Sequence, residues 1–396
     1  MLILNRRRFL QAGSLASASL FVPKFLKALE NSTHAMVPPG NKVLVIIQLS
    51  GGNDGLNTVI PYRNDIYYKL RPNLGIQREK ALSLTDETGL HPAMVGMKAL
   101  YDDGGMGILQ NVGYPNPDRS HFRSMDIWQS ASDSADYWGN GWIGRYLDAQ
   151  CQSIQALEID DTLSLAMKGE FQKGLAFNDP GRLSSGMNAG LYNDLMQQHR
   201  DEEPNVDYLY KTLGATLSSA SYIQKQFKTY ETKENYPSTH LGKSLRTISK
   251  LIMSDISTKV YYVSHGSFDT HVNQQAQQQN LFKQLDDAVT VFARDLKNNN
   301  RFQDVVVMTF SEFGRRVAQN ASNGTDHGTA NNMFLIGGGL KQQGLLNEGP
   351  DLSNLKDGDL QYKVDFKRVY ATLLNKWLGA DDKTILKQDY DYLSFI

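Results

Sequence analysis

The sequence predicts an α/β protein with a mostly parallel central sheet and helices on both faces. Short runs rich in β-branched and aromatic residues alternate along the chain with longer amphipathic segments, which is the order expected of such a sheet. The strand-like runs are mostly apolar, which is typical of strands covered on both faces. A polar stretch at about 155–235 lacks this alternation, and we interpret it as an insertion or cap.

The composition limits the classes of protein that this chain can represent. Of its 396 residues, 40% are hydrophobic and 21% are charged, values typical of a soluble protein with one large domain or two smaller ones. The net charge of −1 gives no basic surface for nucleic acid or an anionic membrane. The chain has a single cysteine, Cys151, which excludes a disulfide framework and a cysteine-rich zinc site. It does not exclude a catalytic cysteine.

The N-terminus has the pattern of a targeting segment. The stretch "NRRRFLQAGSLASASLFVPKFL" at 5–26 has a basic head followed by an Ala- and Ser-rich part, and its arginine pair resembles the twin-arginine export signal. We expect residues 1–35 to form this signal, with the twin-arginine translocase as partner during export. The mature domain at 36–396 would then lie in the periplasm or outside the cell. The apolar part is too short and too polar for a stable membrane span, and an amphipathic helix is the alternative.

Five apolar runs are expected to be strands, and amphipathic segments follow them. The strands are expected at 42–49, 105–113, 259–265, 304–310 and 333–338. Apolar residues with helical spacing predict helices within 241–255, 279–297 and 364–379, the last of them with Gly379 as its C-cap. A further helix is expected to begin near Asp118 or Ser120.

Carboxylates, imidazoles and arginines follow several of these strands. They are Asp54; Ser120, His121 and Arg123; Asp269 and His271; Glu312 and Arg315; and Asp326 and His327. Ligands bind beyond the carboxyl ends of the strands in open α/β sheets, so we expect these side chains to share one edge. Imidazole and carboxylate together suit zinc, manganese or iron, and carboxylate oxygens also suit calcium or magnesium.

Each of these residues also has a purely structural interpretation. Asp54 is in a glycine-rich turn, where an acid commonly bonds to the backbone. Ser120 is equally suited to be a helix N-cap. The alternative interpretation of Arg315 and Arg316 is that they are solvent-exposed charged residues of a helix. The prediction of a site therefore depends on several such residues following strands in one chain.

Several motifs, in order, resemble a family of exported bacterial proteins. They are the twin-arginine head, "QLSGGNDGLN", "RSHFRSMDIWQ", "FDTH", "FSEFGR", "GTDHGTAN" and "VYATLLNKWLG". The chain is similar over nearly its whole length to the domain-of-unknown-function family fifteen-oh-one. That family has no settled activity, and more distant resemblance places its fold in the alkaline phosphatase and sulfatase superfamily.

The resemblance implies a site for one or two divalent ions, zinc, manganese or calcium, at the carboxyl edge of the sheet. In this superfamily a nucleophile at a helix N-terminus attacks a phosphoryl or sulfuryl centre, and Ser120 resembles it. Asp269, His271 and His327 resemble the ligands of the first metal. Asp54 resembles the acid after the first strand.

This chain also departs from the superfamily pattern. Glu312 stands where an adjacent Asp-His pair usually holds the second metal, but Phe313 follows it, so the nitrogen ligand is missing. His121 is not a hallmark of the superfamily and is a candidate acid/base group. Arg123 or Arg315 is suited to hold an oxyanion.

Two functions from different classes follow. The first is an exported metal-dependent hydrolase or transferase that acts on a phosphate or sulfate ester of a small molecule or glycan, with Ser120 as nucleophile. The second is a non-catalytic protein of the same fold that binds an anion or glycan and assists assembly of a surface or extracellular polymer. An exported oxidoreductase is disfavoured, because the sequence has no nucleotide-phosphate loop and no iron–sulfur cysteine set.

Overall fold

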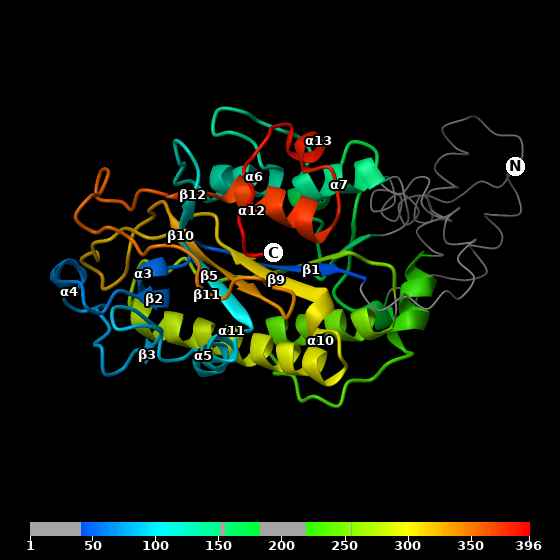
Figure 1. Ribbon diagram of the computed structural model, residues 1–396, viewed down its shortest axis with the longest axis horizontal. Coiled ribbons are helices and arrows are strands. Elements are labelled where there is room, and N and C mark those ends of the chain that lie inside the picture. The colour runs from blue at the N-terminus through cyan, green and yellow to red at the C-terminus, as the bar shows by residue number, and fades with distance from the viewer. Residues whose placement is uncertain (1–40, 151–154, 183–218, 255) are drawn as a thin grey trace, which may run out of the picture.

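The computed structural model describes residues 41–150, 155–182, 219–254 and 256–396 (Figure 1). The expected export signal, the central part of the expected cap and Cys151 lie outside these residues. Among the described helices, none is both long and apolar enough to span a membrane.

A nine-stranded sheet forms the centre of the protein. Its path is β11-β5-β10-β9-β1-β8-β6-β7, and β12 pairs with β5 beside it. The bounds are β1 Val43–Leu49, β5 Met106–Gly113, β6 Ala156–Glu158, β7 Leu175–Ala176, β8 Val260–His265, β9 Val305–Phe310, β10 Asn331–Ile336, β11 Gly344–Leu345 and β12 Val364–Asp365. Every pairing is parallel except those of β10 with β5 and β9. The expected mostly parallel sheet is confirmed.

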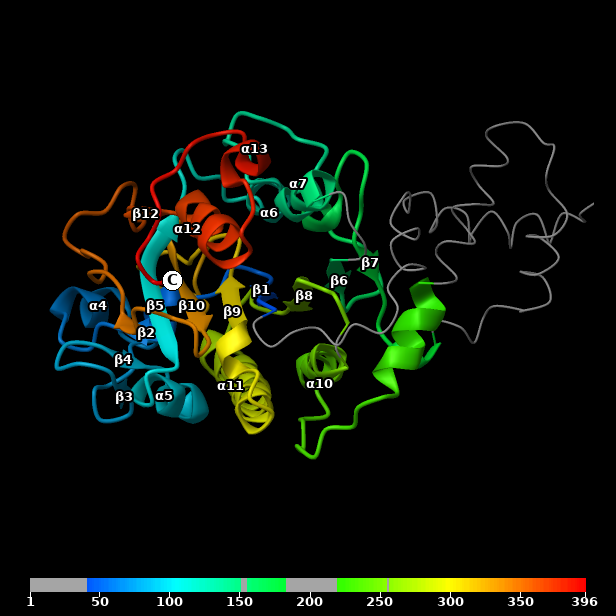
Figure 2. The same ribbon diagram turned by 45° about the vertical axis from the view of Figure 1, so that its right-hand side comes forward.

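Helices cover both faces of this sheet (Figures 1 and 2). One layer contains α5 (Val95–Asp102), α10 (His240–Met253) and α11 (Gln274–Asn298), and the other contains α6 (His121–Ser130), α7 (Trp142–Gln150), α12 (Phe366–Thr372) and α13 (Asp382–Leu386). Val45 of β1 is buried in the first core and the adjacent Ile46 in the second. Successive strand residues point to opposite faces, so burial on both sides explains why all residues of β1 except Gln48 are apolar.

The remaining described elements are short. A three-stranded sheet of order β2-β4-β3 contains β2 (Val59–Ile60), β3 (Leu82–Ser83) and β4 (Gly89–Leu90), near α3 (Gly55–Thr58) and α4 (Asp65–Leu70). Single 3-10 turns are η1 (Leu165–Met167), η2 (Pro180–Arg182) and η3 (Phe302–Asp304).

Two expectations about individual segments need correction. The predicted helix at 364–379 begins as strand β12, continues as α12, and ends in a π-helical turn, η4 (Leu373–Trp377). Gly379 follows with a φ of 67°, a left-handed conformation that glycine adopts without strain. Within the expected cap, β6 and β7 extend the central sheet, because β6 pairs with β8 and β7 with β6.

The direction of β10 determines which loops meet at one edge. Strands β1, β8 and β9 are parallel and in register, with Leu49 opposite His265 and Gln48 opposite Phe310, so their carboxyl ends lie together. Because β10 is antiparallel, its amino end lies at that same edge. The loop at 311–330, which runs from the end of β9 to the start of β10, therefore has both its ends at this edge, beside the loops that follow β1 and β8.

Candidate active site

Three imidazoles surround the carboxylate of Asp269 at this edge. The Nε2 atoms of His271, His327 and His121 lie 2.9, 3.2 and 3.5 Å from Oδ1 of Asp269. His121 is the first residue of α6, Asp269 and His271 follow β8, and His327 precedes β10. Ligand atoms of His121, Asp269 and His327 all lie within 4.8 Å of one another. We call these four residues the His–Asp cluster.

The second ring nitrogen of each histidine faces an oxygen. His121 Nδ1 lies 2.9 Å from Oε1 of Glu312, His327 Nδ1 lies 2.8 Å from the carbonyl oxygen of Arg119, and His271 Nδ1 lies 3.4 Å from Oδ1 of Asp326. An oxygen acceptor at Nδ1 fixes the proton there in the neutral ring, so the lone pair is on Nε2. The three lone pairs therefore point into the His–Asp cluster.

This arrangement fits a divalent cation. Nε2 of His271 lies 2.9 Å from Nε2 of His327, so two lone pairs would face each other unless a proton or a metal ion is shared. Imidazole nitrogens with one carboxylate form a donor set suited to zinc or manganese. Metal-binding histidines commonly donate their other N–H to a carboxylate or backbone carbonyl, and all three do so here.

Arg315 connects the loops that carry the His–Asp cluster. Its side chain is fully buried, and Nη2 donates to Oδ1 of Asp269 at 2.7 Å. Its other acceptors are the backbone carbonyl oxygens of Gly51, Gly52, Phe268 and Thr325 and, at 3.4 Å from Nη1, Nε2 of His271. The structure therefore brings Arg315 to the expected site, and the alternative of a solvated helix charge is wrong. Because its N–H groups are occupied by acceptors of the protein, Arg315 holds Asp269 in place and adds a fixed positive charge.

The glycine turn after β1 permits this close packing. Gly51 has a φ of 118°, and a Cβ atom there would lie 2.4 Å from the backbone nitrogen of Asp269. A Cβ atom on Gly52, whose φ is 77°, would lie 2.3 Å from Cε2 of Phe313. Side chains at either position would push the loops of the His–Asp cluster apart.

Glu312 lies behind His121. Its Oε1 accepts hydrogen bonds from the backbone N–H of Gly51 at 2.8 Å and from His121. Its Oε2 lies 3.3 Å from Oγ of Ser311, whose hydroxyl lies closer, at 2.7 Å, to the carbonyl oxygen of Leu49. The side chain is 1% exposed. In this structure Glu312 orients His121 and fixes the glycine turn.

The structure does not bring Asp54 or Arg123 to the His–Asp cluster. Asp54 forms a buried ion pair with Arg71 at 2.6 Å, accepts from Gln274, and caps α3 through the backbone N–H of Leu56. Arg123 donates to the carbonyl oxygens of Asp133, Ser134 and Asp136, and its guanidinium lies over the ring of Tyr137. Both side chains hold neighbouring loops in place.

Ser120 occupies the N-cap position of α6 and is exposed, and its side chain makes no capping hydrogen bond. The preceding residue, Arg119, holds His327 through its carbonyl oxygen, and the following residue, His121, belongs to the His–Asp cluster. Chain continuity therefore places Ser120 beside this cluster. The amino end of a helix also carries partial positive charge, which favours an anion.

The charges at the site are set by hydrogen bonds and burial. The hydrogen bond to Glu312 raises the pKa of His121, whereas burial lowers the pKa of His327. Partial burial acts to raise the pKa of Asp269, but the hydrogen bond and the positive charge of Arg315 oppose it, and the pKa is lowered to about 2. At neutral pH the site therefore contains an ionised Asp269 and a neutral His327, as metal binding requires.

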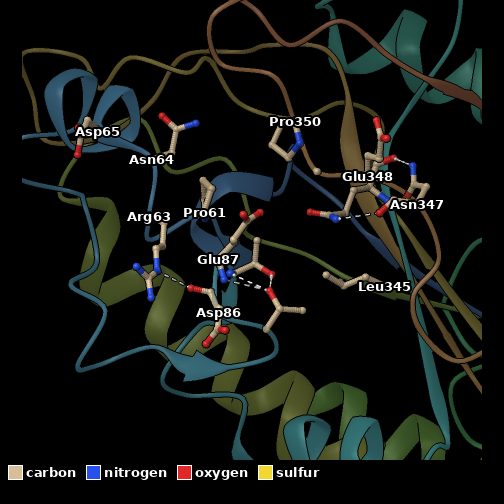
Figure 3. A pocket seen from close by; sticks show the side chains of 14 residues that line it. Pro61, Arg63, Asn64, Asp65, Asp86, Glu87, Leu345, Asn347, Glu348 and Pro350 are labelled. Carbon is tan, nitrogen blue, oxygen red and sulfur yellow. Dashed lines mark hydrogen bonds between the residues drawn. The ribbon is translucent and has the colours of Figure 1, made fainter.

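A separate cleft of about 820 Å³ lies elsewhere on the described surface, and no residue of the His–Asp cluster lines it (Figure 3). Its charged lining residues are Arg63, Asp65, Asp86, Glu87 and Glu348. Nε of Arg63 donates to the carbonyl oxygen of Asp86 at 2.7 Å. With four acids and one base, this cleft is unsuited to an anionic ester.

Comparison with known families decides where the chain belongs. The family model described as "Protein of unknown function (DUF1501)" matches residues 105–389. The chain belongs to this family. The DUF1501 match runs from β5 to beyond α13 and includes all four residues of the His–Asp cluster, together with Ser120, Glu312 and Arg315. The strand β1 and its glycine turn lie before the matched region. Among curated proteins, none matches the sequence.

Several solved structures are similar to this DUF1501 protein at low identity. The C-terminal periplasmic domain of EcEptC from Escherichia coli, in complex with Zn, is 10% identical over 77% of this chain and 76% of its own, with a TM-score of 0.35. The PsFucS1 sulfatase from Pseudoalteromonas sp. is 9% identical over 85% and 68%, with a TM-score of 0.36. A protein in the alkaline phosphatase superfamily from Vibrio parahaemolyticus is 9% identical over 98% and 78%, with a TM-score of 0.36. At such low similarity we transfer no activity from these proteins.

Proposed function

We propose that this DUF1501 protein is a divalent-metal-dependent hydrolase or transferase that acts on a phosphate or sulfate ester. The observation that supports this proposal most strongly is the convergence of three Nε2 atoms on Oδ1 of Asp269. Each of these imidazoles has its Nδ1 against an oxygen, an arrangement typical of metal ligands.

In this proposal His121, Asp269, His271 and His327 hold the ion, and Asp326 supports His271 from behind. When bound, the ion would polarise an oxygen of the ester and favour ionisation of a nearby hydroxyl. Zinc and manganese suit the mixed nitrogen and oxygen donors better than calcium, which prefers six to eight oxygens.

Ser120 is the proposed nucleophile. Its hydroxyl loses a proton as the oxygen bonds to phosphorus or sulfur, and the alcohol of the ester leaves and takes up a proton. Water then accepts the group from Ser120 in a hydrolase, or a second alcohol accepts it in a transferase. The amino end of α6 favours the negative charge of the transferred group.

The alternative is a protein of the same fold that binds an anion or glycan without catalysis. The position of Glu312 favours it, because this side chain is 1% exposed and its Oε1 already accepts hydrogen bonds from Gly51 and His121. In either case we infer from residues 1–35 that the protein is exported by the twin-arginine route and acts in the periplasm or outside the cell.

Turnover of simple esters tests the proposal. The exported protein is assayed with p-nitrophenyl phosphate and p-nitrophenyl sulfate, with added zinc, manganese or calcium. We expect turnover with one of these ions, a loss of about 100-fold or more in Ser120→Ala, and no change in the exposed control Ser322→Ala. No turnover of either ester with any of the three ions would contradict the enzymatic function and favour the binding alternative.

A further inference from the structure

A pocket of about 380 Å³ opens next to the His–Asp cluster. Its walls come from three segments, which follow β5, precede β10 and precede β12. Arg119 is one of the residues that line the pocket, and its carbonyl oxygen lies 2.8 Å from Nδ1 of His327. Thr329, two residues after His327, lines it as well. A group bound in this pocket would therefore lie beside Ser120 and the proposed metal ligands.

The wall before β12 is a tight hairpin. Lys356 and Asp359 exchange two backbone hydrogen bonds of 3.0 Å. The two residues between them, Asp357 and Gly358, have φ values of 54° and 81°, as a type I′ turn requires. This wall is thus fixed by local backbone geometry before any ligand arrives.

One buried oxygen in the pocket lacks a hydrogen bond. Asp359 is 1% exposed, and its Oδ2 is paired with Arg119. Among the described residues its Oδ1 has no hydrogen-bond donor, and Nε of Arg316 lies 3.8 Å from it. Buried carboxylate oxygens almost always have donors, so a ligand that supplies one would satisfy this atom. Because Arg119 already balances the charge of Asp359, a hydroxyl group suffices.

The other lining groups suit a ring that carries hydroxyls. Tyr362 is 38% exposed and offers part of an aromatic ring, while Tyr114 is buried. Asn116 adds an amide, and Gln361, whose amide nitrogen donates to Asn354, adds an acceptor oxygen. An aromatic face covers the C–H surface of a sugar ring, while amides and a carboxylate bond to its hydroxyls. The volume is at the lower end of ligand pockets, which fits a single ring.

We propose that this pocket binds one uncharged sugar ring, so that the substrate of the site is an ester of a sugar. This assignment rests on the proposed function for the identity of the ester, but binding of the ring itself requires neither the metal nor catalysis.

Saturation-transfer NMR on the exported, metal-free protein tests the assignment. The probes are methyl glycosides of glucose, galactose, mannose and N-acetylglucosamine. We expect at least one to bind with a dissociation constant in the millimolar range. Tyr362→Ala and Gln361→Ala should each weaken that binding about tenfold or more, while Tyr362→Phe and Phe171→Ala, an exposed aromatic outside the pocket, should preserve it.

Two outcomes would overturn the proposal: no glycoside binds, or the binding is unchanged in both Tyr362→Ala and Gln361→Ala. These outcomes can be separated from failure of the proposed function. If p-nitrophenyl esters are hydrolysed but no glycoside binds, the sugar assignment is wrong and the enzymatic function stands. If a glycoside binds in the pocket but no ester is hydrolysed, the sugar site stands and the enzymatic function is wrong.

Discussion

Nη2 of Arg315 lies 2.7 Å from Oδ1 of Asp269, the same oxygen that the Nε2 atoms of three histidines surround. One carboxylate oxygen thus connects a permanent cation to the proposed metal ligands. The guanidinium keeps Asp269 ionised and fixes its position relative to the glycine turn. Arg315 is therefore central to both the stability and the geometry of the site.

Replacing Arg315 with Gln should destabilise the protein strongly. The change leaves the carbonyl oxygens of Gly51, Gly52, Phe268 and Thr325 without their donor, and Asp269 without its closest cation. We expect the free energy of unfolding in urea to fall by about 3–5 kcal/mol. The matched control is Arg316→Gln, whose side chain is 39% exposed and should cost less than about 1 kcal/mol. Equal losses in the two variants would show that Arg315 has no special structural role.

Replacing Glu312 with Gln should weaken metal binding while preserving the fold. Gln keeps an oxygen for the N–H of Gly51 but removes the negative charge beside His121. Loss of such a partner typically lowers metal affinity about 10–100-fold, and calorimetric titration with zinc measures it. Glu348→Gln, at a side chain that is 91% exposed, is the control. Unchanged zinc affinity in Glu312→Gln would mean that His121 is not a ligand.

Glu158 should make stability depend on pH. Burial raises the pKa of this carboxyl from 4.5 to about 7, so the folded state binds a proton that the unfolded state releases between these values. Stability contributed by the protonated form is therefore lost as pH rises through this window. The native chain loses this stability, whereas Glu158→Gln does not. The free energy of unfolding of the variant, relative to that of the native chain, should therefore increase by roughly 2–3 kcal/mol as the pH rises from about 4 to about 8.

Denaturant unfolding at both pH values measures this gain, and Glu170→Gln, at an exposed residue, should show none. A constant difference between Glu158→Gln and the native chain across the window would contradict the raised pKa.

The sheet could be predicted from the sequence because strands that are buried on both faces consist mainly of apolar residues. Every residue of β1 is buried, and six of them are apolar. This run can therefore be predicted as a buried strand from its residue types alone. The direction of β10 cannot be predicted in this way, since parallel and antiparallel buried strands contain the same residue types. That direction is nevertheless what brings His327 to the carboxyl ends of the other strands.

The site could be predicted only in part, because a residue type does not specify its partner. Asp54 and Asp269 both follow strands, yet Asp54 pairs with Arg71 in the interior, and Asp269 meets the histidines. His265, the last residue of β8, is buried against the carbonyl oxygen of Leu281 and does not join the His–Asp cluster. The carbonyl oxygen of Arg119, which orients His327, has no side-chain signature at all.

The metal content of the exported protein tests the central claim most directly. Elemental analysis of the native chain should give about one divalent ion per chain, and the double variant Asp269→Ala, His327→Ala should retain almost none while staying folded. His240→Ala, at an exposed histidine outside the His–Asp cluster, should keep the native content. A native chain without metal, or a double variant with undiminished metal, would contradict the proposed metal site.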